Sequence, residues 1–182
     1  FLANSGVWPM IRQRPYNVVP DTDVTPKNIF VSTFDSAPLA PNLNLVVEGN
    51  EAAFQKGLEV LAMLTEGSVH LGLNASDTNI STAFTEAAGV EKHWFQGAHP
   101  AGNVGIQIHH TAPINKGDTV WTAGVQDVIV IGRLFTEGRF NTERLVALTG
   151  AELTSTHYVK TYQGANLETF IEGNLENEHV RV

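Results

Sequence analysis

The segment Lys27–Pro41 places polar side chains at the end of an apolar run. Asp35 and Ser36 follow the β-branched and aromatic residues of Ile29–Val31, and the segment then turns at a proline. Open α/β sheets bind ligands in the crevice at the carboxyl ends of their strands, where loops of this kind occur. We therefore predict that the loop Phe34–Pro38 belongs to a binding site. The alternative is a plain proline-rich turn after a strand.

A second set of candidate residues lies in the stretch GAHPAGNVG. Its glycines, Gly97, Gly102 and Gly105, would let backbone N–H groups approach a ligand closely. No Lys-Ser/Thr pair follows Gly102, so the stretch is not a nucleotide phosphate loop. His99 is the histidine that we most expect to contact a ligand. The alternatives are that the glycines form a tight turn and that His99 only caps backbone groups.

The sequence gives no support for a metal site or for nucleophilic catalysis. His109 and His110 are adjacent, so on a strand they would face opposite ways and on a helix they would lie about 100° apart. No pair of histidines has the spacing of a zinc motif, and the chain has no cysteine. No serine lies in a G-x-S-x-G turn. We therefore predict no metal ligand and no catalytic residue in this chain.

Composition and charge exclude two further classes of protein. The formal net charge is -8, and no cluster of Lys and Arg offsets it, which disfavours binding to a phosphate backbone. The longest purely apolar run is Val128–Ile131, whereas a membrane-spanning helix needs about 20 such residues. We expect no nucleic-acid partner and no transmembrane segment.

The elements that must position these residues alternate between strand-like and helix-like segments. We predict strands at Lys27–Phe34, Ser68–Leu73, Glu91–Gln96 and Thr119–Ala123. We predict the tail of a helix in residues 1–14, a short extended piece at Val46–Glu48, a helix at Glu51–Leu64 and a short helix from Ser76 or Asp77 to Gly89. This alternation is typical of a largely parallel sheet with helices on its faces.

Two segments permit either assignment from the residues alone. Val104–His109 alternates in the manner of a strand, although Pro100 and the small residues after it could start a helix. Val125–Phe135 is rich in Val and Ile, which favours a strand, although its length allows a helix. From residue 141 onward, two short strands and a helical turn at Leu167–Glu172 indicate a small α+β unit.

Four blocks of the sequence resemble the A subunit of the sodium-translocating NADH:quinone oxidoreductase. They read FVSTFDSAPLAP, FQKGLEVLAMLTEGSVHLGL, HPAGNVGIQIHH and DTVWTAGVQDVIVIGRLFTEGRFNTERLVALTG, in the order that the family has them. The resemblance covers nearly all 182 residues and implies that the chain is the middle portion of a longer subunit. It also implies kinship with the flavin-binding subunit of respiratory complex I and with the C subunit of the Rnf electron-transport complex.

This kinship implies an α/β fold. Residues 1–140 would form a layered α/β/α domain with a mainly parallel sheet, resembling the flavin subunit of complex I. Residues 141–182 would begin a small β-grasp-like α+β unit. The kinship also implies that Pro100–His110 and Val125–Phe135 are helices, against their local strand propensity.

The resemblance further implies that the flavin site of these relatives is lost. In them, the loop that matches Phe34–Pro38 carries two acidic residues, of which only Asp35 remains here, because Ala37 replaces the second. The segment Val125–Val128 likewise lacks the pattern of the relatives. A flavin needs several fixed protein partners, so we expect none to be bound. The crevice, either vestigial or a quinone site, would be lined by Phe34, Asp35, Ser36, His99, Gly102 and Asn103.

The function implied is that of a soluble peripheral subunit on the cytoplasmic face of the bacterial inner membrane. It would support electron transfer from NADH to quinone coupled to Na⁺ export, and the isolated chain would be inactive. NADH, flavins, iron–sulfur centres and quinone would belong to the whole complex, whose other subunits would be the partners of this chain. Quinone is a further candidate ligand. The alternatives are a non-enzymatic assembly scaffold and an Rnf-type flavin-binding electron-input module.

Overall fold

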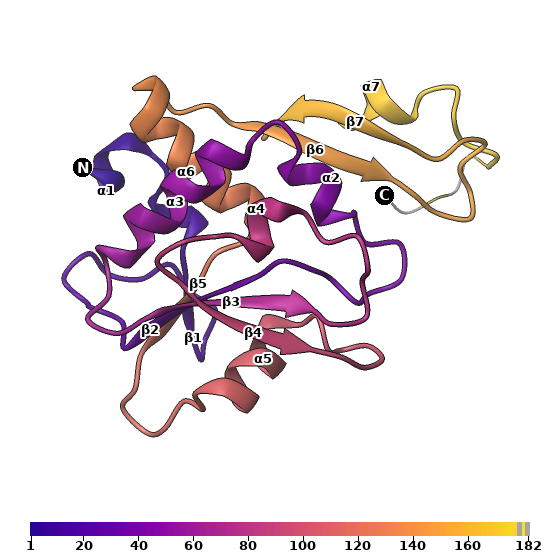
Figure 1. Cartoon of the computed structure of the whole chain (residues 1–182). Coiled ribbons are helices and arrows are strands. Elements are labelled where there is room, and N and C mark those ends of the chain that lie inside the picture. The colour runs from indigo at the N-terminus through magenta and orange to yellow at the C-terminus, as the bar shows by residue number, and fades with distance from the viewer. Residues whose placement is uncertain (178–179, 181–182) are drawn as a thin grey trace. The chain divides into compact units, whose positions relative to one another are not determined.

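The computed structural model describes residues 1–177 and 180, which form two compact units (Figure 1). The first unit comprises Phe1–Ala37 and Asn42–Asn141, and the second comprises Pro38–Pro41 and Thr142–Val182. All six residues predicted for the crevice lie in the first unit.

A five-stranded sheet forms the centre of the first unit, with the strand order β1-β5-β2-β3-β4. Its strands are β1 (Arg12–Arg14), β2 (Asn28–Ser32), β3 (Val69–Asn74), β4 (Glu91–Phe95) and β5 (Val120–Thr122). Strands β2 to β5 are mutually parallel, and β1 pairs antiparallel with β5. The chain leaves the central strand β2 toward β3 and returns to its other side as β5. The carboxyl end of β2 is therefore a topological switch point, where sheets of this class bind ligands.

Helices cover both faces of this sheet. They are α1 (Leu2–Ser5), a 3-10 helix η1 (Trp8–Met10), α2 (Leu43–Val47), α3 (Glu51–Ala62), α4 (Thr82–Thr85), α5 (Val104–Thr111) and α6 (Val125–Glu137). Figure 1 shows α3 and α6 on one face of the sheet and α5 on the other. Phe30 of β2 packs with Ile108 and Val120 in a buried cluster under α5. Ile29 and Val31 alternate with Phe30, so they face the α3 and α6 side.

Helices α3 and α6 pack at backbone contact through two glycines. A Cβ atom on Gly57 would lie 2.1 Å from the carbonyl oxygen of Val128, and one on Gly132 would lie 1.8 Å from that of Ala53. No side chain fits at these distances, so only glycine permits this approach.

The second unit is a small α+β arrangement. Strands β6 (Glu143–Leu148) and β7 (His157–Tyr162) form an antiparallel pair, and α7 (Glu168–Ile171) follows them. The side chain of Asn174 accepts hydrogen bonds from the hydroxyls of Thr154 and Ser155, which ties the end of this unit to the turn between its strands.

The predicted α/β fold class is confirmed, with its mainly parallel sheet, and the two strands of the second unit pair antiparallel. Helices α5 and α6 confirm the assignment implied by the resemblance, and the local strand propensity of both segments is misleading. The reason is topological. Parallel strands need a crossover, and α5 supplies it between β4 and β5. The β-branched residues of α6 are buried instead, among them Val128 and Ile131.

Three local predictions are wrong. The segment Val46–Glu48 is not extended, because Asn42 caps a helix that begins at Leu43 and its side chain accepts the N–H of Asn44. Residues 1–14 contain the short α1 and η1 in place of the end of a longer helix, and their last three residues form β1. All three residues of this edge strand β1 are polar, so it cannot be recognised as an apolar run in the sequence.

The third error concerns the start of α4. This helix begins at Thr82 with Ser81 as its cap, well after Ser76 and Asp77. The side chains of Asn74 and Asp77 accept backbone N–H groups two residues ahead, which holds this stretch in turns.

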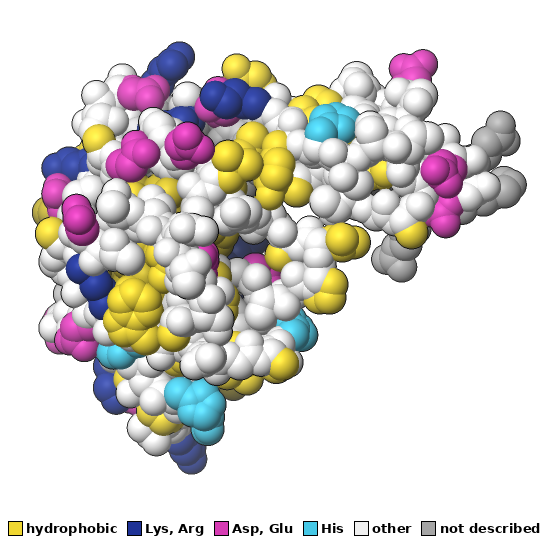
Figure 2. All heavy atoms as spheres, turned by 45° about the vertical axis from the view of Figure 1, so that its right-hand side comes forward, with side chains coloured by type: hydrophobic (Ala, Val, Ile, Leu, Met, Phe, Trp, Pro, Cys, Tyr) yellow, Lys and Arg dark blue, Asp and Glu magenta, His cyan; other side chains and the backbone are white. Residues whose placement is uncertain are grey.

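The surface carries mixed charges. On the face drawn in Figure 2, acidic side chains and Lys or Arg side chains are interspersed, without a continuous basic patch. Within the described part of the chain, no helix combines the length and the apolar character needed to cross a membrane.

Candidate functional site

Two loops meet above the carboxyl end of β2. The backbone N–H of Gly102 donates a hydrogen bond to Ser36 Oγ at 2.9 Å, and Ser36 Oγ and His99 Nδ1 share another at 3.1 Å. The structure therefore brings together three of the six predicted residues. Ser36 and Gly102 are separated by 66 positions in the sequence, so only the fold places them side by side.

The contact between the loops is a close approach of two backbones. A Cβ on Gly102 would lie 2.4 Å from the backbone nitrogen of Ser36 and 2.9 Å from the carbonyl carbon of Asp35. The backbone of Gly102 thus fills the space directly beside the loop after β2. Glycine thus permits a close approach of backbone to backbone, and the approach of these N–H groups to a ligand stays a prediction.

The other three predicted residues have different roles. The Oδ1 atom of Asp35 accepts the N–H of Ala37 at 2.8 Å, so this exposed carboxylate stabilises its own loop. The side chain of Asn103 accepts the N–H of Gly105 at 2.9 Å and caps α5. Phe34 is half-buried, and its carbonyl oxygen accepts a hydrogen bond from Ser32 Oγ at 2.8 Å.

A buried amide that the sequence analysis missed supports both loops from below. Gln107 of α5 is only 1% exposed, and its Nε2 donates to Ser32 Oγ at 2.8 Å and to the carbonyl of Ala101 at 3.3 Å. Ser32 Oγ in turn lies 3.1 Å from the carbonyl of Gly102. The one signal in the sequence was a polar residue inside the apolar stretch Val104–Ile108.

The arrangement resembles a polar binding rim more closely than a nucleophilic site. Ser36 and His99 form a hydroxyl–imidazole pair, but the nearby carboxylate of Asp35 is engaged by its own loop and the imidazole is exposed. A nucleophile of the serine type needs a base that a third group orients. The pair is suited instead to exchanging hydrogen bonds with a polar group of a ligand.

A second cluster, which the sequence analysis did not anticipate, lies on β3 and β4. His70 Nδ1 and His93 Nε2 share a hydrogen bond of 2.9 Å, and His70 Nδ1 is 3.5 Å from Glu91 Oε2. Burial lowers the pKa of His70 below its ordinary value, because desolvation disfavours the imidazolium form; Glu91 acts in the opposite direction. The hydrogen bond from Ser68 Oγ is the main reason that the pKa of Glu91 is also lowered.

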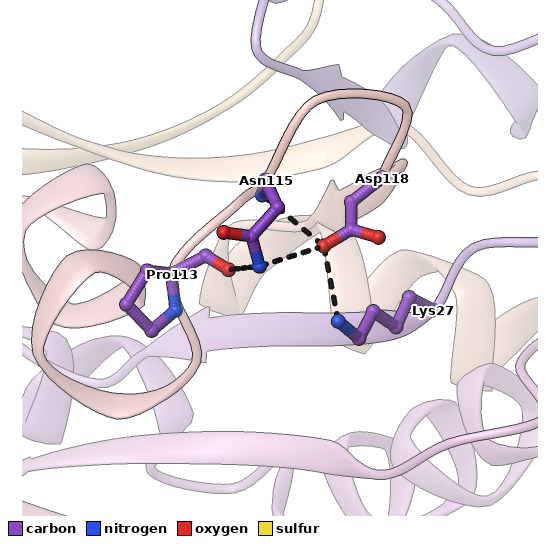
Figure 3. Close-up of polar contacts among 4 residues, drawn as sticks. All are labelled: Lys27, Pro113, Asn115 and Asp118. Atoms are coloured by element: carbon purple, nitrogen blue, oxygen red, sulfur yellow. Dashed lines mark hydrogen bonds and ion pairs between the residues drawn. The ribbon is translucent and has the colours of Figure 1, made fainter.

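The amino edge of the sheet carries an exposed ion pair. Lys27 Nζ is 3.0 Å from Asp118 Oδ2, which also accepts the backbone N–H of Asn115 at 3.1 Å (Figure 3). The hydrogen bond from Lys27 is the largest cause of a pKa for Asp118 below its usual value. This edge is opposite to the one at which α/β sheets bind ligands.

The second unit contains an apolar pocket of about 720 Å³. Its lining includes Val146, Leu148, Leu153, Leu167, Ile171 and Leu175. None of the six residues predicted for the crevice lines this pocket.

The comparisons with known proteins agree along the whole chain. Residues 1–140 match the family model described as the NqrA second alpha/beta domain, and residues 145–182 match the one described as the NQRA C-terminal domain. The chain is 43% identical to the A subunit of the Na(+)-translocating NADH-quinone reductase of Saccharophagus degradans, over 100% of this chain and 40% of that protein.

Two further relatives have the same name. Identity is 41% to the protein of Alcanivorax borkumensis, over 96% of this chain and 38% of that protein. It is 39% to the protein of Neisseria meningitidis, over 100% of this chain and 40% of that protein. The chain therefore spans about two fifths of the length of these relatives.

Proposed function

Because the chain belongs to the NqrA family, we propose that it works as part of the A subunit of a sodium-translocating NADH–quinone reductase. In that complex it supports electron transfer from NADH to quinone coupled to Na⁺ export. It lies peripherally on the cytoplasmic face of the bacterial inner membrane, in contact with the other subunits. The observation that carries the proposal is the match of two successive NqrA domain models to residues 1–140 and 145–182.

We propose that this part of the subunit holds no flavin of its own. A flavin requires a cavity and several fixed polar partners. The backbone of Gly102 packs directly against Asp35 and Ser36, and the carboxylate of Asp35 accepts the N–H of Ala37. Both observations support a loop whose polar groups are engaged within the protein.

The rim formed by Ser36 and His99 is our candidate for quinone contact. Ser36 Oγ already accepts the N–H of Gly102, so its own hydrogen can be donated to His99 Nδ1. In that tautomer the Nε2 atom of the exposed imidazole carries a hydrogen, which can be donated to a quinone carbonyl. Half-buried Phe34 adds an apolar surface nearby in the same loop.

Titrations of the purified chain test both parts of this proposal. Flavin mononucleotide is followed by flavin fluorescence and a water-soluble quinone by tryptophan fluorescence. We expect no saturable flavin binding. Quinone binding is expected to weaken in His99→Gln and to stay unchanged in the control His109→Gln, which alters an exposed histidine on α5. Saturable flavin binding in the micromolar range would contradict the loss of flavin.

The role in the complex is tested in the full-length subunit. His99→Gln and His109→Gln are introduced separately, the complex is purified, and NADH-dependent quinone reduction is measured together with the subunit composition. We expect His99→Gln to raise the KM for quinone without loss of subunits. If His99→Gln leaves the KM for quinone unchanged, the proposed quinone contact is wrong. Membership in the complex is tested separately, by copurification of the subunit with the other subunits.

A further inference from the structure

Three potential metal ligands project from the same face of two neighbouring parallel strands. In the pairing of β3 with β4, His70 is opposite Glu91 and Gly72 is opposite His93. Residues two apart on a strand share a face, so His70, Glu91 and His93 lie together. One ligand atom from each lies within 4.8 Å of the other two.

The separations between these atoms suit a small ion. His70 Nδ1 is 2.9 Å from His93 Nε2 and 3.5 Å from Glu91 Oε2. A tetrahedral zinc ion binds nitrogen and oxygen ligands at about 2.0–2.2 Å, which places the ligand atoms roughly 3.3–3.6 Å from one another. Only small movements of the more exposed side chains, His93 and Glu91, are needed to admit the ion.

His70, the most buried member of the cluster, is held in place by packing. His70 is 6% exposed, and its ring stacks on Phe30 with the centroids 4.4 Å apart and an interplanar angle of 20°. Glu91 is held by its other oxygen, Oε1, which accepts a hydrogen bond from Ser68 Oγ at 2.5 Å. Such outer contacts orient metal ligands in known sites.

The metal-free arrangement leaves one polar atom unpaired. Within residues 1–177 and 180, the buried Nε2 of His70 has no hydrogen-bond partner. Nδ1 is the atom that faces His93 and Glu91. A neutral imidazole that binds an ion through Nδ1 carries its hydrogen on Nε2, so the same buried atom stays unpaired and no further unpaired group is added.

We infer that His70, Glu91 and His93 bind a divalent transition-metal ion of the zinc type and thereby join β3 to the edge strand β4. Two imidazoles and one carboxylate favour such an ion over Mg²⁺ or Ca²⁺, which prefer oxygen ligands. The side chain of Glu91 is 57% exposed, so an ion can reach the cluster from solvent. This inference is independent of the proposed role in the reductase.

The test uses the whole chain, purified without a polyhistidine tag and dialysed against a chelator. Zinc chloride is titrated by calorimetry, and the melting temperature is measured with and without zinc. The ligand variants are His93→Gln and Glu91→Gln, which change side chains that are not fully buried. The matched control is His109→Gln, because His109 and His110 form the adjacent pair of exposed histidines on α5.

We expect the wild-type chain to bind one zinc ion and to melt at a higher temperature in its presence. Each ligand variant should bind zinc at least about tenfold more weakly and lose the rise in melting temperature, whereas the control should keep both. Cobalt(II) should give the visible absorption of a four-coordinate site with the wild type and not with His93→Gln. Equal zinc affinity of the wild type and His93→Gln, or no binding by the wild type, would overturn the inference.

Discussion

Gly102 donates its backbone N–H to Ser36 Oγ at 2.9 Å, and the side of its Cα that would carry a side chain faces the backbone of the loop after β2. This contact joins the two loops that the sequence singled out, one after β2 and one after β4. The lack of a side chain at position 102 is what allows this contact.

Replacing Gly102 with alanine should destabilise the fold. The new Cβ would lie 2.4 Å from the nitrogen of Ser36, so a backbone segment must move. We expect a loss of about 1–3 kcal/mol in the free energy of unfolding, measured by urea denaturation. Gly105→Ala is the control, because its nearest contact is the side-chain oxygen of Asn103 at 3.2 Å, and alanine is the better helix former. Equal losses for the two variants would refute this account.

A double-mutant cycle tests the buried amide of Gln107. A Cβ on Gly72 would lie 2.1 Å from Gln107 Oε1, so Gly72→Ala should cost about 1–3 kcal/mol of stability. Gln107→Ala should also destabilise, since Ser32 and Ala101 lose a donor. In the double variant the space vacated by the amide accepts the new methyl group. We expect the double variant to lose less stability than the sum of the two single variants, by about 0.5–3 kcal/mol. Strict additivity of the two losses would argue against the contact between Gly72 and Gln107.

The close contact between α3 and α6 predicts that a side chain at position 132 lowers the stability of the fold. Gly132→Ala should destabilise by about 1–3 kcal/mol or more, because the methyl group would meet the carbonyl of Ala53 and neither helix backbone can yield alone. Chemical denaturation measures the change, again with Gly105→Ala as the matched glycine control. A neutral effect would mean that the two helices separate easily.

The ion pair between Lys27 and Asp118 predicts an acid dependence of stability. The pKa of Asp118 is lowered in the folded state, so its contribution is present above the ordinary aspartate pKa of about 4 and is lost as the pH falls through the lower folded value. The difference in melting temperature between the wild type and Lys27→Met should therefore shrink between about pH 5 and pH 2. Salt at about 1 M should also reduce this difference in melting temperature at neutral pH, because it screens exposed charges.

The control for this prediction is Lys116→Met, which removes a neighbouring lysine and the same formal charge. Its melting temperature should follow that of the wild type across the acid range. An identical acid profile for Lys27→Met and Lys116→Met would show that net charge, and not the pair, governs the response.

The sequence predicted the long elements because their signals are local. Glu51–Leu64 presents an apolar face at helical spacing, and the structure has α3 at Glu51–Ala62. The run Ile29–Val31 is apolar throughout, as expected of a strand covered on both faces, and Val69–Leu73 is apolar at every second residue. The crossover helix α5 could not be predicted from its residues, because the need for it arises from the pairing of β5 with β2.

The candidate site was predictable only in part for the same reason. Strand-end position identified Ser36, His99 and Gly102, but the choice of partner for each hydrogen bond depends on the approach of two loops. The pairing of His70 with His93 depends on the register between β3 and β4. A shift of one residue in that register would place the two imidazoles on opposite faces.

The hydrogen bond between Gln107 and Ser32 joins positions 75 residues apart. The chain between its two ends includes β3 and β4, and α5 must pack against β2 before the ends can meet. The entropy of closing so long a loop must be offset before this contact contributes anything. The two loops above β2 are therefore expected to order late in folding, and a ligand that binds there would select molecules whose topology is complete.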